Sequence, residues 1–133
     1  MSTALRAELT LPTEPIAAAM ARAGVANLSA ELSDELTADI ALLTTEIVSN
    51  AVRHSPASTL TQIQLRAEVG DGRIRVEVTD AGAGFSPHTR SRPGDLAASG
   101  WGLVLLDRLA SRWGVLPGSD GSTVWFEVDT ASR

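Results

Sequence analysis

"LLTTEIVSNAVRHSP", residues 42–56, is the second half of a predicted helix that carries polar residues within its apolar stripe. The helix is predicted to begin at Ser33, whose hydroxyl can cap it, and to end before Pro56, because the residue preceding a proline resists helical torsion angles. Apolar residues recur along it at helical spacing, at Leu36, Ile40, Leu43, Ile47 and Ala51. The pattern predicts a long helix with one buried face.

Two polar residues disturb this stripe. Asn50 lies inside it, and Glu46 lies at its edge one turn earlier. Burying an unpaired carboxamide costs about 1 to 3 kcal/mol, so either the fold or a ligand must supply its partners. Two interpretations stay open: a core asparagine bonded to the backbone, or a polar pair that faces a bound ligand.

Short alternating segments elsewhere in the chain predict strands. They lie at 5–11, 60–69, 72–80 and 122–128. A helix is predicted over 13–28, a tight hairpin turn at "GDG" between the two middle strands, and another helix over 102–114, "GLVLLDRLASRWG". Antiparallel strand pairs beside helices predict an α+β fold, a two-layer sandwich with helices on one face of a mixed, mostly antiparallel sheet.

Length and composition exclude several classes of function. The 133 residues fit one domain, 1–133, with a formal net charge of -5 that argues against general nucleic-acid binding. Without cysteine, and with His54 and His88 as the only imidazoles, a zinc site is not expected. All eleven basic residues are arginine, so arginine must meet any phosphate. No apolar run approaches the roughly 20 residues of a membrane span, and we expect a cytoplasmic protein.

Two glycine-containing motifs follow the hairpin. "DAGAGF", Asp80 to Phe85, comes at a strand end, where glycines let the backbone approach a ligand. "SGWGL", Ser99 to Leu103, opens a predicted helix, whose free N–H groups suit phosphate. Each motif alone also fits an ordinary turn or helix boundary. Residues 81–101 show neither helical nor strand periodicity, which indicates a functional or mobile segment.

Taken in order, these motifs resemble a known family. "EIVSNAVRHS", "DAGAGF" and "SGWGLVLLDRLASRWGV" are similar to the N, G1 and G2 boxes of the histidine-kinase-like (GHKL) ATPases, the superfamily of DNA gyrase, heat-shock chaperones, histidine kinases and mismatch-repair proteins. The similarity runs from about residue 8 to 129 and implies a Bergerat-type ATP-binding fold. Within the superfamily the chain most resembles the small anti-sigma factor serine kinases, in particular short actinobacterial members.

The resemblance implies roles for the matching positions, with ATP and Mg²⁺ as cofactors. It implies that Asn50 holds Mg²⁺, that Glu46 is the general base or orienting carboxylate for an attacking hydroxyl, and that Asp80 accepts a hydrogen bond from the adenine amino group. The remaining nucleotide contacts that it implies are four motif glycines and one strand threonine near the adenine site: Gly82, Gly84, Gly100, Gly102 and Thr123. A plain strand threonine is the alternative for the last of these.

Two positions depart from the family's pattern. Val104 stands where many sensor histidine kinases have a small residue, which looks more like the serine-kinase branch. Ser122 stands where the family often has a lysine, so the γ-phosphate must rely on Mg²⁺ and on Arg90 or Arg92. Solvated loop charge is the alternative for these two arginines.

The resemblance implies an ATP-dependent protein serine/threonine kinase that acts as an anti-sigma factor. Its implied partners are a sigma factor and an anti-anti-sigma (STAS-type) protein that it phosphorylates, and it implies a homodimer. The alternatives are a catalytically inactive nucleotide-binding regulator that acts only through protein–protein binding, and a degenerate domain without nucleotide. A histidine kinase is disfavoured because the chain has no predicted helical hairpin carrying a phosphoacceptor histidine.

Overall fold

The computed structural model gives the chain five strands and two long helices, and it describes residues 5–28, 32–54, 62–80, 104–117 and 121–130. The elements follow in the order β1 (Leu5–Pro12), α1 (Ile16–Leu28), α2 (Asp34–His54), β2 (Gln62–Gly70), β3 (Arg73–Asp80), β4 (Arg112–Pro117) and β5 (Ser122–Asp129). A short helical segment, 104–109, precedes β4. The four predicted strands are confirmed to within two residues at each end.

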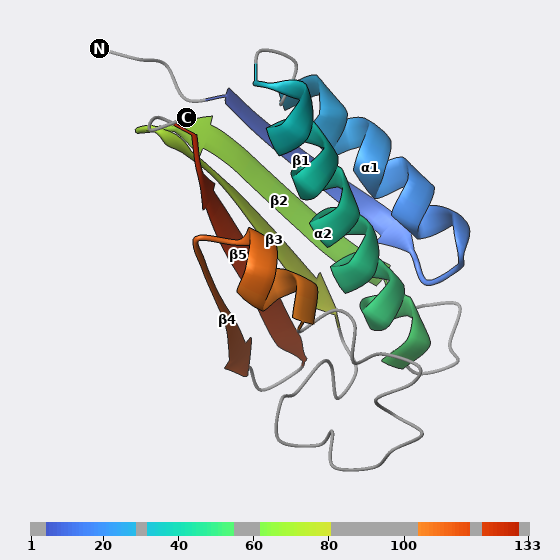
Figure 1. Ribbon diagram of the computed structural model, residues 1–133. Coiled ribbons are helices and arrows are strands. Elements are labelled where there is room, and N and C mark those ends of the chain that lie inside the picture. The colour runs from blue at the N-terminus through green and yellow to red at the C-terminus, as the bar shows by residue number, and fades with distance from the viewer. Residues whose placement is uncertain (1–4, 29–31, 55–61, 81–103, 118–120, 131–133) are drawn as a thin grey trace.

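The five strands form one sheet in the order β1-β2-β3-β5-β4. Both α1 and α2 pack on the same face of it, and no described helix covers the other face, which we call the open face (Figure 1). The predicted α+β two-layer sandwich is confirmed. The sequence predicts a mixed, mostly antiparallel sheet, and each described strand pairing is antiparallel.

The core lies between the helices and the sheet. The predicted stripe of α2 is buried throughout, because each of its apolar residues faces the sheet or α1: Leu36, Ile40, Leu43, Ile47 and Ala51. The strands alternate as a half-buried sheet requires, with one face apolar and the other polar. Their inward residues complete the core: Leu11, Ile63, Leu65, Ile74, Val76, Val78, Val124, Phe126 and Val128.

The start of α2 follows the predicted capping chemistry. The Ser33 hydroxyl accepts a hydrogen bond from the Leu36 N–H at 3.1 Å, and the Ser33 carbonyl accepts one from the Thr37 N–H at 2.9 Å. The first bond satisfies a donor that the first helical turn leaves free, and the second is the first regular backbone hydrogen bond of the helix. The predicted boundary at Ser33 is therefore confirmed, and the described helix ends at His54, two residues before Pro56.

The hairpin between β2 and β3 is also confirmed. Asp71 and Gly72 both have positive φ, 56° and 76°. Two consecutive left-handed residues are typical of a type I′ turn, whose twist matches that of antiparallel strands.

The predicted helix over 102–114 is wrong in its second half. Within the described residues it covers 104–109 only, and Arg112 already begins β4, which pairs with β5. Trp113 and Val115 pack against the core from one side of that strand. The residues of this segment have high helix propensity. The hydrogen bonds with β5 and the burial that they allow outweigh that propensity, and both depend on contacts distant in sequence.

The described helices contain no segment with both the length and the apolar character required to cross a bilayer.

Candidate functional site

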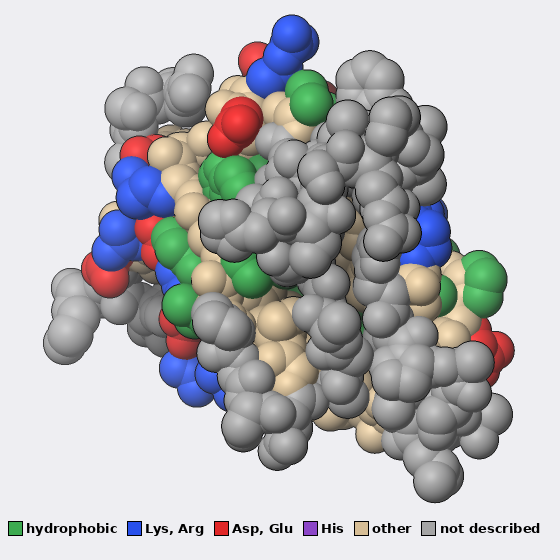
Figure 2. All heavy atoms as spheres, turned by 90° about the horizontal axis from the view of Figure 1, so that it is seen from below, with side chains coloured by type: hydrophobic (Ala, Val, Ile, Leu, Met, Phe, Trp, Pro, Cys, Tyr) green, Lys and Arg blue, Asp and Glu red, His purple; other side chains and the backbone are tan. Residues whose placement is uncertain are grey.

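Two elements end and a third begins at one end of the sheet. The C-terminal turn of α2, the last residue of β3 and the first residue of β5 lie at the lower end of the molecule in Figure 1. In the view from this end, charged side chains of the described residues lie toward the margins, while apolar and uncharged atoms occupy the centre between grey residues (Figure 2).

Asn50 is the most informative residue of this end. It is 1% exposed, and its Oδ1 accepts a hydrogen bond from Arg53 Nη2 at 2.5 Å. Its Nδ2 is buried and has no hydrogen-bond partner within the described part of the chain. A buried, unpaired amide donor costs about 1 to 3 kcal/mol. A core asparagine satisfied by the backbone does not fit this geometry, because one of the two ends of the carboxamide is unpaired there.

Asp80 and Ser122 form a second pair of buried polar residues. Asp80 ends β3 and is 3% exposed, and its register partner Ser122 begins β5 and is 7% exposed. The Ser122 Oγ is buried without a hydrogen-bond partner among the residues that the structure describes. Both side chains follow the inward alternation of their strands, on the face that the helices cover.

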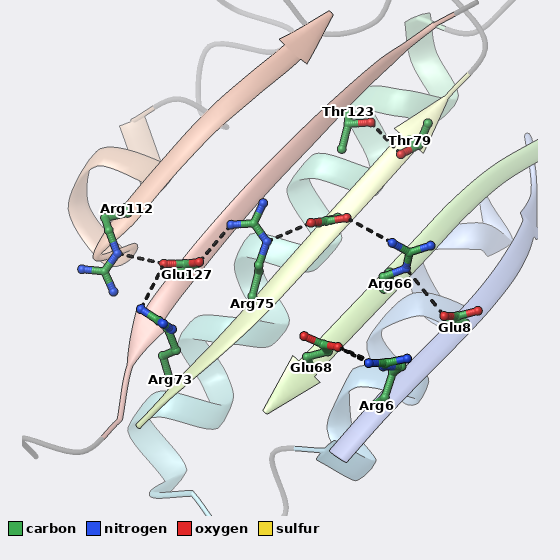
Figure 3. Close-up of polar contacts among 11 residues, drawn as sticks. Arg6, Glu8, Arg66, Glu68, Arg73, Arg75, Thr79, Arg112, Thr123 and Glu127 are labelled. Carbon is green, nitrogen blue, oxygen red and sulfur yellow. Dashed lines mark hydrogen bonds and ion pairs between the residues drawn. The ribbon is translucent and has the colours of Figure 1, made fainter. Parts of the chain in front are cut away.

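Thr123 lies on the opposite face of the sheet. Its hydroxyl and that of its register partner Thr79 are 2.7 Å apart on the open face (Figure 3). The predicted nucleotide contact of Thr123 is therefore not supported by its position. Ser122, one residue earlier, shares the face of Asp80. The period of two in "STVWFEV" could have identified Ser122, because the buried Val124, Phe126 and Val128 share its parity.

Glu46 lies one helical turn before Asn50 on α2. Glu46 is partly exposed, whereas Asn50 is buried. This i, i+4 spacing places a solvent-accessible carboxylate on the same side of the helix as the buried carboxamide. The described helix therefore places both predicted residues on one side of α2.

Arg53 is a further candidate site residue, which the sequence motifs do not single out. It is exposed and lies three residues after Asn50, on the same side of α2. A guanidinium is always charged and presents several donors that match phosphate oxygens. The i, i+3 spacing from Asn50 is the signal that could have identified it.

The other predicted site positions lie outside the described residues. They are the motif glycines and the arginines of segment 81–101: Gly82, Gly84, Gly100, Gly102, Arg90 and Arg92.

Comparison with known proteins agrees with this arrangement. Residues 11–128 match the family described as histidine kinase-like ATPase domain. No curated protein matches the chain. The histidine kinase domain from Erythrobacter litoralis EL346 blue-light activated histidine kinase is 26% identical with a TM-score of 0.56, and the match covers 73% of this chain and 46% of that one.

A second solved structure, of the Erythrobacter litoralis EL346 blue-light activated histidine kinase, is also 26% identical, with a TM-score of 0.62. That match covers 77% of this chain and 33% of the kinase chain, so this chain spans less than half of either solved chain. The family match, by contrast, extends over most of the chain and includes every described site residue. The chain therefore belongs to the histidine kinase-like ATPase domain family.

Proposed function

We propose that this protein is a Mg²⁺-dependent, ATP-binding serine/threonine kinase that acts as an anti-sigma factor and phosphorylates a STAS-type anti-anti-sigma partner. The observation that carries the proposal is Asn50, a buried carboxamide with an unpaired Nδ2 beside the accessible carboxylate of Glu46. A protein that only needed a stable core gains nothing from this pair. A bound nucleotide and its metal ion give both residues a role.

The residues present fit a magnesium ion. Mg²⁺ prefers hard oxygen ligands and usually takes one or two from the protein, with the rest from phosphate and water. The Asn50 Oδ1 is such an oxygen, and it accepts its present hydrogen bond from Arg53. Phosphate oxygens can take over the Arg53 guanidinium, which leaves the carboxamide oxygen for the metal. When bound, Mg²⁺ supplies charge neutralisation at the phosphates.

Adenine recognition is assigned to the pair at the strand ends. Asp80 offers a buried carboxylate that can accept a hydrogen bond from the adenine amino group, and Ser122 offers a buried hydroxyl beside it. A site built to bond a specific amino group rejects a base that lacks it, because the buried partner would be left unpaired. Ser122 thereby takes the role near the adenine site that the resemblance implies for Thr123.

We assign Glu46 the role of general base, which accepts the proton of the incoming hydroxyl. The serine or threonine oxygen of the partner attacks the γ-phosphorus, the bond from that phosphorus to the ADP oxygen breaks, and the hydroxyl proton passes to the Glu46 carboxylate. Such transfer depends mainly on positioning and charge stabilisation, so one accessible carboxylate and a charge-neutralised phosphate are sufficient parts.

Phosphotransfer to purified STAS-type proteins from the same genome, measured with radiolabelled ATP, tests the proposal. We expect wild-type protein to label one such partner on serine or threonine, and Glu46→Gln to lose labelling while it retains ATP binding. Glu35→Gln is the matched control, because Glu35 lies on the same helix in its exposed first turn. Undiminished transfer by Glu46→Gln would overturn the role of Glu46. ATP binding without transfer to any partner would identify a regulator that acts through binding alone.

A further inference from the structure

The strand β4 forms one edge of the sheet, and within the described residues it pairs only with β5 (Figure 1). Such an edge leaves backbone N–H and C=O groups of alternate residues available to another strand. We propose that β4 is the docking site for an extended segment of a different protein, which adds to the sheet as a further strand and places an acidic residue opposite Arg112 among apolar residues. The site involves neither Asn50 nor Asp80 and does not depend on the proposed phosphotransfer.

Arg112 presents a fixed cation at this edge. Its Nε donates to Glu127 at 2.8 Å and its Nη2 donates to Asp129, so two carboxylates of β5 hold the guanidinium in place. The third nitrogen, Nη1, donates to no described residue, and the side chain is 45% exposed. Figure 3 shows this residue at the β4 end of the ion pairs on the open face. A guanidinium that is already oriented loses little side-chain freedom when it binds a further carboxylate.

The charges around Arg112 favour an anion in the partner. Glu127 is contacted by three guanidinium groups, those of Arg112, of Arg75 at 2.9 Å and of Arg73 at 3.9 Å. The three cations outweigh the single charge of this carboxylate, so Glu127 does not repel a second carboxylate placed on the outer side of Arg112. Opposite charges directly across two strands stabilise a sheet.

The strand that already pairs with β4 shows which chemistry fits it. Side chains of a strand project above and below the sheet, so the neighbours on both of its edges meet the same side chains. From β5 these side chains receive one carboxylate, two aromatic rings, a valine and a threonine. The opposed pairs are Arg112–Glu127, Trp113–Phe126, Gly114–Trp125, Val115–Val124 and Leu116–Thr123. A partner segment with a similar alternation of acidic and apolar residues therefore fits the outer edge.

Apolar surface is exposed on both faces of β4. On the open face Leu116 is 53% exposed, and the indole of Trp125 lies over Gly114, where a Cβ would be 2.9 Å from Trp125 Nε1. On the helix-covered face Trp113 and Val115 pack against the core and remain partly exposed. In strand addition, main-chain hydrogen bonds supply affinity and contacts of alternate side chains supply specificity. Both kinds of contact are available along this edge.

A second copy of this chain does not supply the required acid by pairing β4 with β4. The strand contains one cation, Arg112, and no anion. A two-fold axis at Gly114 places Arg112 opposite the partner's Leu116, and an axis at Trp113 places it opposite the partner's Gly114. Neither register sets a carboxylate across from the guanidinium. Pro117 ends the strand and lacks an N–H, so it restricts pairing to the residues before it.

A synthetic peptide with the sequence of residues 123–128, TVWFEV, is a probe of this chemistry. Carrying a polar Gly-Ser tail and fluorescein, it is titrated with full-length protein in the absence of nucleotide and followed by fluorescence anisotropy. We expect saturable binding at micromolar concentrations. Peptides with glutamine or lysine in place of the glutamate should bind about fivefold and about tenfold more weakly. No binding of the glutamate peptide, or equal binding of the glutamate and lysine peptides, would overturn the proposal.

Arg112→Gln separates the contact from the fold. In this variant the glutamate and glutamine peptides should bind equally, because the guanidinium that distinguishes them is absent. A folding defect weakens both peptides alike and preserves their ratio. Arg66→Gln is the matched control, since Arg66 lies on the open face of the interior strand β2, and the preference for glutamate should stay at about fivefold. A preference that survives Arg112→Gln contradicts the proposed contact.

Amide signals of isotope-labelled protein locate the peptide. On addition of the peptide, the backbone amides of 113–116 should shift and exchange more slowly with solvent, and those of β1 at the other edge should not change. Leu116→Lys should weaken all three peptides, because a charge at an edge opposes strand addition. Changes centred on β1 would refute docking at β4. Self-association of wild type that Leu116→Lys abolishes would assign the edge to a second copy instead. Because no nucleotide is present, either failure leaves the proposed ATP site untouched.

Discussion

Asp80 and Ser122 are register partners at the ends of β3 and β5, and both are buried on the helix-covered face of the sheet. Thr123, the next residue, projects from the opposite face, where its hydroxyl meets that of Thr79. Two adjacent residues of similar chemistry are thus separated by the full thickness of the sheet. They provide a matched pair of substitutions for locating the nucleotide.

Ser122→Ala should weaken ATP binding, and Thr123→Ala should leave it unchanged. Loss of one hydrogen bond costs about 0.5 to 1.5 kcal/mol, which corresponds to an affinity about two- to tenfold lower. Fluorescence or calorimetric titration with ATP measures the effect. The assignment of Ser122 fails if Thr123→Ala proves to be the more damaging substitution.

Arg53→Ala should weaken binding of ATP far more than binding of adenosine. In the proposed complex, the Arg53 guanidinium donates to a phosphate oxygen in place of Asn50 Oδ1. A hydrogen bond to a charged group contributes about 1.5 to 3 kcal/mol. The expected loss of ATP affinity is therefore about 10- to 100-fold. Arg22→Ala is the control, since Arg22 lies on α1 and bonds Thr45. An equal loss for both ligands would place Arg53 outside the phosphate site.

Glu127 should make the fold sensitive to acid. The hydrogen bond from Arg112, and then that from Arg75, hold the pKa of Glu127 below its ordinary value of 4.5, against the opposing effect of its burial. A lowered folded pKa means that the unfolded chain takes up the proton first. The stabilisation is therefore complete above pH 4.5 and is lost as the pH falls through that value toward the lower folded pKa.

Urea unfolding between about pH 7 and about pH 3 measures this loss. In Glu127→Gln the decline of the unfolding free energy with acid should be shallower than in wild type, since the titrating group is absent. Arg112→Gln, which removes the largest cause of the lowered pKa, should reduce the slope in part. An unchanged acid slope in Glu127→Gln would show that Glu127 is not the responsible carboxyl.

Gly114 should be intolerant of a side chain. A Cβ there would lie 2.9 Å from Trp125 Nε1, and the Trp125 ring also carries the Arg75 guanidinium at 4.3 Å from its centroid. Gly114→Ala must displace the indole, at a cost of about 1 to 3 kcal/mol in unfolding free energy. The same substitution in a Trp125→Ala background should cost much less. Equal costs in both backgrounds would show that the indole is not the obstacle.

The sequence was sufficient for the parts of the fold that depend on local periodicity. The stripe of α2 and the Asp71–Gly72 turn follow from spacing and turn chemistry within a few residues, and both are confirmed. The strand β4 was missed because residues 104–114 favour a helix locally, while the partner that makes them extend, β5, comes later in the chain. Non-local pairing of this kind is not visible in a short window.

The candidate site was predictable where burial conflicts with polarity. Asn50 interrupts an apolar stripe, whereas Asp80 was indicated by its glycine-containing motif, and the structure finds both buried. Arg53 gave no such conflict, because an exposed arginine at a helix end resembles an ordinary solvated charge. Ser122 and Thr123 differ only by strand parity, which a resemblance between short motifs does not resolve.

The central claim is that Asn50 is buried in order to face a metal-bound nucleotide. Calorimetric titration with ATP, with and without Mg²⁺, on wild type and on Asn50→Ala tests it most directly. We predict saturable binding by wild type that requires Mg²⁺, and weak binding by Asn50→Ala that Mg²⁺ no longer improves. Equal ATP affinity in both proteins, or no binding by folded wild type at all, would contradict the claim and make Asn50 a residue of the core alone.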